Sequence, residues 1–265
     1  MYKKKKAIFI LVVYYFIMFV QLFIVNIMIL SIGGHIVESM NLDINTIIFK
    51  FIMQVPPTFF VIYMVKKYFS SEETGLKKIN KKNLVWFLPY IIVIIFMINK
   101  FIYEIIINKN YLNISIYIIM ILGFIGTCMA GFCEEVIYRG IILNSFKNKK
   151  SIIPSMIISS LSFSILHIVT IFMGIPWIDV LYRIIYSGLL GFSFVGLVIK
   201  LNSIWPIIIF HILWNYIVMI SQVLSIELSR ASGLCNILNI FMAIILWSII
   251  IMDEKRKEEM QKIYR

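Results

Sequence analysis

The chain has 265 residues, of which 61% are hydrophobic and only 14% are charged. A soluble globular domain is nearer half apolar and a quarter charged, so this composition excludes an ordinary soluble domain and indicates a polytopic membrane protein. The formal net charge of +12 could suggest a nucleic-acid partner. However, the lysines fall in short clusters between apolar runs, which is typical of cytoplasmic membrane flanks. We therefore expect a multi-pass protein of the cell membrane, with the lipid bilayer as its surroundings and no nucleic acid as partner.

The chain begins with a basic segment, Lys3–Lys6, followed by an unbroken apolar run, Ala7–Leu30. A cleaved signal peptide also starts with basic residues, but its apolar core is only about 7–15 residues long and a small-residue cleavage site follows it. Here the run is longer and no such site is evident. It is therefore predicted to be the first transmembrane helix.

Further apolar runs long enough to cross a bilayer follow at regular intervals. Their expected bounds are about 46–65, 83–107, 111–146, 151–172, 177–199, 203–223 and 235–252. The second span contains Pro56 and Pro57, which predict a kink. The fourth is too long for one straight spanning helix, so Gly123, Gly126 and Gly131 are candidate positions for a break or a tilt. The sequence thus predicts an all-α polytopic bundle of about eight transmembrane helices.

Every second connection between the runs is rich in lysine: 3–6, 66–82, 147–150, 200 and 255–257. Because cytoplasmic loops carry an excess of lysine and arginine, we expect both termini to be cytoplasmic, with Asp253–Arg265 as a charged tail. No internal repeat, linker or second domain is evident. We expect a single integral membrane domain over 1–265, with a motif-bearing catalytic core at about 114–219.

Three charged residues, Glu134, Glu135 and Arg139, interrupt the fourth apolar run. A charged residue at a helix centre costs about 2.5–3.5 kcal/mol on insertion scales, so this cluster requires an explanation. Glu135 and Arg139 are four residues apart on one helix face and can neutralise each other. Glu134 is rotated by about 100° from them, so its carboxylate has no partner in this pair. A structural ion pair between helices is one explanation, but the spare glutamate favours chemistry.

Two histidines, His167 and His211, also lie inside apolar runs, whereas His35 lies in a predicted loop. His211 and Asn215 are four residues apart and point the same way on a helix. At 1.5 Å per residue, Glu134, His167, His211 and Asn215 all lie about 16–24 Å from the basic end of their spans. Unrelated interhelical hydrogen bonds would also explain these residues. A shared site is the simpler account.

Such a site has the groups that amide hydrolysis requires. A carboxylate and a histidine can deprotonate a water, while a second histidine and an asparagine amide can donate to the oxyanion of a tetrahedral intermediate. Other hydrolytic mechanisms fit worse. The sequence has no HExxH motif for a zinc protease, no GxSG motif for a serine protease, and no aspartate in mid-span. The cysteines form no CxxC pair, so we predict neither a disulfide framework nor a thiolate metal site.

Spaced motifs follow one another on successive predicted spans: Glu134–Arg139 (EExxxR), Phe163–His167 (FxxxH) and His211–Asn215 (HxxxN). In this combination the chain resembles the CPBP family of CAAX proteases and bacteriocin-processing enzymes, also called the Abi family. The resemblance implies a glutamate-dependent intramembrane endopeptidase. It further implies that Glu134 and His167 activate water and that His211 and Asn215 form the oxyanion hole. The ion pair of Glu135 with Arg139, expected from their spacing, would support this site.

A metal ion is left open by these residues. Glu134, His167 and His211 could ligate zinc as a His₂Glu set with an open position. The glutamate–water mechanism needs no metal, and Asn215 is better explained as an oxyanion donor. We therefore expect no obligatory metal or other cofactor.

The expected substrate is a membrane-bound peptide or a membrane protein, cut near the cytoplasmic side. Two other functions stay open at this point. The chain could be a non-catalytic bacteriocin-immunity or partner-binding protein that keeps the polar cluster as a helix clamp. It could also be a proton-coupled transporter that uses Glu134 as its relay group.

Overall fold

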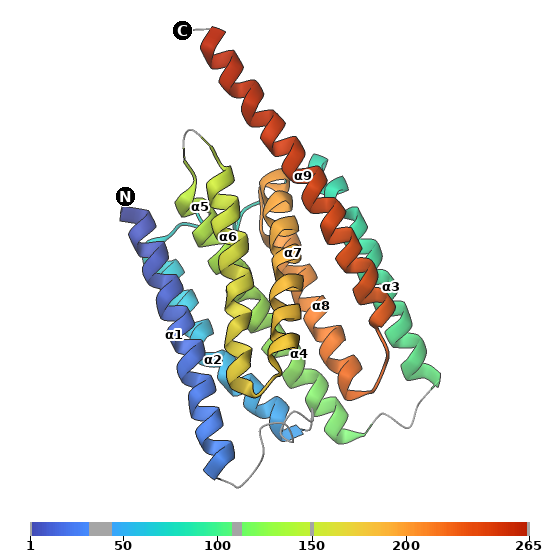
Figure 1. Ribbon diagram of the computed structural model, residues 1–265. Coiled ribbons are helices and arrows are strands. Elements are labelled where there is room, and N and C mark those ends of the chain that lie inside the picture. Colours follow the sequence, from blue (N-terminus) through green and yellow to red (C-terminus); the bar gives the residue numbers. More distant parts are fainter. Residues whose placement is uncertain (1, 32–43, 108–112, 149–150, 264–265) are drawn as a thin grey trace.

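The computed structural model describes residues 2–31, 44–107, 113–148 and 151–263, and within these ranges all regular structure is helical. Eight helical units are long and apolar enough to cross a membrane. They lie side by side in one bundle (Figure 1). The predicted all-α bundle of about eight spans is therefore confirmed, and the chain is a multi-pass membrane protein.

The bundle is built from α-helices with three short segments of other helix type, which are labelled η. In chain order these are α1 (Tyr2–Ser31), α2 (Ile44–Tyr68), the 3₁₀ segment η2 (Lys81–Phe87), α3 (Leu88–Ile107), α4 (Ile114–Glu135), the π-helical η4 (Val136–Ile142), α5 (Leu143–Phe146), α6 (Ile153–Leu166), the 3₁₀ segment η5 (His167–Met173), α7 (Trp177–Leu201), α8 (Trp205–Val223) and α9 (Ser229–Ile263). The most extensive contacts pair α4 with α2 and α8, and α7 with α6 and α9. The segments that carry the motifs thus lie against one another.

The second span continues as a helix through both prolines. Pro57 has no N–H to donate to the carbonyl of Met53, one turn earlier. Gln21 of α1 supplies the missing donor, because its Nε2 lies 2.9 Å from the Met53 oxygen. A neighbouring helix therefore satisfies the backbone group that the proline leaves free, as membrane-embedded prolines require.

The fourth span changes its helix type, although not at the glycines that the sequence suggested. α4 ends at Glu135 and continues as the π-helical η4, in which an N–H bonds the carbonyl five residues back. The N–H of Leu143, for example, donates to the Tyr138 oxygen. The expected break at Gly123, Gly126 or Gly131 was wrong, because those glycines lie inside a continuous α-helix.

Gly131 instead allows α4 to approach α8 closely. A Cβ atom at this position would lie 2.9 Å from Cγ1 and 3.4 Å from the backbone nitrogen of Ile212, so that no side chain fits. Ile212 directly follows His211 on α8. The contact therefore brings the carboxylates at the end of α4 next to the histidine of the HxxxN motif.

Two further spans differ from the predicted ones. The fifth changes from α-helix to 3₁₀ helix at His167, and η5 ends where Gly174 adopts a left-handed φ of 74°. The last helix, α9, begins at Ser229 and runs on through the charged segment to Ile263. The helix therefore begins six residues before the predicted start at about 235, and the predicted charged tail continues it as helix as far as Ile263. The segment after Met252 is rich in glutamate, lysine and arginine, which are good helix formers, and it contains neither glycine nor proline.

The lysine-rich ends of the helices gather at one end of the bundle, where α1 begins and α9 ends (Figure 1). Polar contacts join the elements there. Lys200 at the end of α7 pairs with Asp253 of α9 at 2.9 Å, and Lys3 pairs with Glu73 of the connection between α2 and η2. That this end faces the cytoplasm stays a prediction.

We predict that single cysteines at the two ends of the bundle will differ in their access from outside the cell. In a background without the three native cysteines, Ser229→Cys at the start of α9 should react with an impermeant thiol reagent in intact cells. Ser71→Cys, in the lysine-rich connection, should react only after the membrane is opened. Labelling of Ser71→Cys but not Ser229→Cys in intact cells would invert the orientation.

Candidate active site

Glu135, the last residue of α4, is fully buried and binds two donors through one oxygen. Its Oε1 lies 3.1 Å from Nη1 of Arg139, whose side chain is also fully buried, and 2.7 Å from Nδ1 of His211. The sequence predicted the partner one helical turn away. It did not predict His211, because residue spacing within one helix says nothing about which side chain of α8 packs against it.

The bond to Glu135 fixes the orientation of the His211 ring. A carboxylate only accepts hydrogen bonds, so Nδ1 of His211 carries a proton and donates it. The other ring nitrogen, Nε2, then points to Glu134, whose Oε2 is 3.7 Å away. Glu134, for which the sequence predicted no partner on its own helix, therefore faces a histidine of another helix. Its side chain keeps 15% exposure, whereas that of Glu135 is fully buried.

His167 is the first residue of η5 and is half-buried. Its Nδ1 lies 3.2 Å from the Phe163 carbonyl oxygen, one turn earlier on α6. Because that oxygen only accepts, Nδ1 is the donor, and Nε2 of the neutral ring keeps its lone pair. The rings of His167 and His211 both contact the Phe163 ring, with centroids 5.4 Å and 6.0 Å away. The two histidines from separate motifs are thus brought to one place.

Asn215 lies one turn after His211 on α8 and is partly buried. Within the described part of the chain its amide makes no hydrogen bond to another residue, so it is available to a bound substrate. His35, which the sequence analysis placed in a loop, lies outside the described residues.

The zinc set considered from the sequence is not assembled as a metal centre. Over the described ranges, no three His, Cys, Asp or Glu side chains are arranged to hold a metal ion. Glu134, His167 and His211 therefore do not fit a zinc site in this arrangement, and the chemistry below uses no metal-dependent step.

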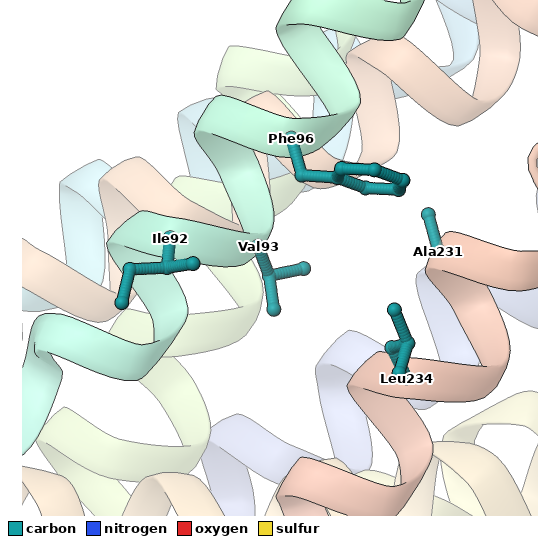
Figure 2. Close-up of a pocket in the computed structure, with 5 residues that line it drawn as sticks. All are labelled: Ile92, Val93, Phe96, Ala231 and Leu234. Atoms are coloured by element: carbon teal, nitrogen blue, oxygen red, sulfur yellow. The ribbon is translucent and has the colours of Figure 1, made fainter.

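A separate cavity of about 170 Å³ lies between α3 and α9 (Figure 2). Its lining is entirely apolar and consists of Ile92, Val93, Phe96, Ala231 and Leu234. It offers no group for acid–base chemistry and contains none of the motif residues. The cluster around Glu135 is therefore the better candidate for an active site.

We predict that the two adjacent glutamates differ in what they contribute to stability. Removal of one partner from a buried charge pair typically costs about 3–5 kcal/mol, because the other charge stays buried without compensation. Glu135→Gln should therefore lower the free energy of unfolding in detergent by this order. Glu134→Gln should change it little, because the Glu134 carboxylate lies beyond hydrogen-bond distance of His211.

The solvent-accessible ion pair between Lys200 and Asp253 provides the control for this measurement. Asp253→Asn should cost at most about 1 kcal/mol, as is usual for exposed pairs. If Glu134→Gln proves to be the least stable of the three variants, the roles of the two glutamates are reversed.

Comparison with known proteins agrees with the motifs. Residues 115–217 match the family model described as type II CAAX prenyl endopeptidase Rce1-like. Neither a curated protein nor a solved structure matches the chain. The matched segment runs from the first turn of α4 into α8 and contains all the residues of the cluster described above. The resemblance drawn from the motifs is thus confirmed over residues 115–217, which are similar to the Rce1-like type II CAAX prenyl endopeptidases.

Proposed function

We propose that the chain is an intramembrane endopeptidase that hydrolyses a peptide bond in a membrane-associated peptide or protein. The family match supports a CAAX-type intramembrane protease. The observation that carries the finer proposal is the arrangement of Glu134, Glu135 and His211. Glu135 binds one ring nitrogen of His211 at 2.7 Å, and the partly exposed Glu134 faces the other at 3.7 Å. The proposed catalytic core, at about 114–219, lies within a single membrane domain.

In the proposed reaction, Glu134 is the general base that takes a proton from water. The oxygen of that water attacks the carbonyl carbon of the substrate and forms a tetrahedral intermediate. His167 assists, because its Nδ1 donates to the Phe163 carbonyl and its Nε2 can accept a hydrogen bond from the water. When the C–N bond breaks, Glu134 returns the proton to the leaving nitrogen, so that the products are a carboxylic acid and an amine.

The negative charge on the oxygen of the intermediate requires hydrogen-bond donors. The free amide of Asn215 is one of them. His211 can donate from Nε2 only as an imidazolium, because its Nδ1 proton is already bonded to Glu135. The oxyanion role that the family resemblance implies thus comes with a required charge state of His211.

The two non-proteolytic functions explain less of this geometry. A helix clamp in an immunity or partner-binding protein would use Glu135, Arg139 and His211, which bind one another. It would have no use for Glu134, which adds no hydrogen bond to that network and stays partly exposed. A proton-coupled transporter would use Glu134 as its relay group, but would have no need for donors directed at a substrate oxygen.

We expect the purified protein in proteoliposomes to cut a fluorogenic C-a-a-X peptide with a farnesylated cysteine, and Glu134→Gln to abolish the cleavage. Without a carboxylate at position 134, no general base of the right strength faces the substrate. Product masses would identify the bond that is cut. Equal cleavage by the native protein and Glu134→Gln would contradict the proposal. Loss of native activity in a chelator, with recovery on adding zinc, would contradict the absence of a metal step.

A second expectation concerns the oxyanion donor. Loss of one such donor typically slows turnover by about 10²–10³-fold, or about 2.7–4 kcal/mol, because the donated bond matters most in the transition state. Asn215→Ala should therefore lower kcat by this order and change KM little. Asn215→Asp should do no better, because it places a negative charge against the oxyanion. Full activity of Asn215→Ala would remove Asn215 from the mechanism.

A further inference from the structure

Phe163, the first residue of the FxxxH motif, is 1% exposed, and its ring touches four side chains of the site. Cζ of Arg139 lies over the ring, 4.0 Å from its centroid. The rings of His167 and His211 meet it almost at right angles, with interplanar angles of 80° and 90°, and the Tyr138 ring lies 5.3 Å away. No step of the reaction described above involves this side chain directly.

The guanidinium of Arg139 has fewer hydrogen bonds than a buried charge normally requires. Its Nη1 donates to Glu135, whereas Nε and Nη2 are buried and have no hydrogen-bond partner among the described residues. Such unpaired buried donors are costly. The cation lies instead against two aromatic rings, Phe163 at 4.0 Å and Phe194 at 5.5 Å. A cation over an aromatic face is attracted by the ring quadrupole, most strongly where water is excluded.

The position of Arg139 affects the position of His211 through the carboxylate of Glu135. Arg139 and His211 share one oxygen of Glu135, so a displaced guanidinium would also move the carboxylate that orients the imidazole. Phe163 therefore acts on His211 in two ways: through Arg139 and Glu135, and by direct contact with the imidazole ring. The Phe163 ring also contacts the imidazole of His167, so both histidines of the site pack on one ring.

We infer that Phe163 is a positioning residue, whose ring holds the Arg139 guanidinium by cation–π attraction. It thereby keeps the side chains of Glu135 and His211 oriented toward Glu134. The catalytic part of this inference rests on the proposed function. The anchoring of Arg139 does not, because it concerns the folded protein without substrate. If Phe163 merely filled space, any ring of the same shape could replace it. The proposed role depends instead on the negative electrostatic potential at the face of the ring.

Stepwise fluorination of the ring separates these two roles. Mono-, di- and trifluorophenylalanine at position 163 change the shape of the side chain little, but weaken the attraction of its face for a cation. Phe192 provides the matched control, because it is a partly buried aromatic residue whose ring packs on Trp247 at 5.2 Å. Among the described residues it makes no ring or cation–π contact with the site. The same series at position 192 reports the effect of fluorine on packing alone.

With the farnesylated peptide as probe, kcat should fall step by step along the series at position 163, by about 10- to 30-fold for the trifluoro ring. This range corresponds to the loss of one desolvated cation–π contact. KM should stay within about twofold, since the substrate-binding groups are untouched. Phe163→Leu should be at least as slow as the trifluoro variant. The series at position 192 should leave kcat unchanged.

The unfolding temperature gives a second readout that needs no turnover. It should fall stepwise with each fluorine at position 163 and show no such trend at position 192. A flat series at 163 in both kcat and unfolding temperature, or equal trends at the two positions, would overturn the inference. If Glu134→Gln cleaves as well as the native protein, the proposed function fails, and the unfolding series still decides whether Phe163 anchors Arg139.

Discussion

A carboxylate enclosed among apolar helices has to be paired, and Glu135 meets this requirement with two donors on one oxygen. Arg139 comes from the next turn of the same chain segment, while His211 comes from α8. One buried charge therefore joins α4, η4 and α8. The close approach at Gly131 makes the bond possible, since a side chain there would push α8 away from the carboxylate.

Two of the three irregular helical segments in the described part of the chain, η4 and η5, begin at the site. η4 starts directly after Glu135, and η5 starts at His167. In η4 the carbonyl of Gly140 accepts a hydrogen bond from Nδ2 of Asn144 at 2.8 Å. A Cβ on Gly140 would lie 2.7 Å from the Thr74 oxygen, so the connection between α2 and η2 packs directly on this turn. π-Helical turns are frequent at functional sites, and here such a turn carries the arginine that neutralises Glu135.

The contrast between Glu134 and Glu135 links the fold to the chemistry. The two residues are adjacent in sequence, but the α-helix directs them about 100° apart. One carboxylate is fully buried with fixed donors, while the other keeps some exposure and lies beyond hydrogen-bond distance of Nε2 of His211. The first suits orientation of a histidine, and the second suits exchange of protons with a substrate.

Much of this could be predicted from the sequence, because hydropathy and spacing are properties of single segments. Apolar runs predicted the spans, and the four-residue spacing predicted the pair of Glu135 with Arg139. The shared oxygen between Glu135 and His211 could not be predicted, since it depends on which faces of α4 and α8 meet. The helix changes at Val136 and His167 also escaped prediction, because no proline or glycine lies within three residues of either position. Phe163 was read as part of a motif, but its contact with Arg139 exists only after α6 packs beside η4.

The central claim is that Glu135 holds the Nδ1 proton of His211 and turns Nε2 toward Glu134. Nitrogen-15 NMR of the imidazole rings in the purified protein tests it most directly, since the chain has only 3 histidines and each can be assigned by substitution. The account predicts a proton on Nδ1 of His211, with the downfield proton shift of a strong bond to a carboxylate. A neutral His211 with its proton on Nε2 and a bare Nδ1 would contradict the account.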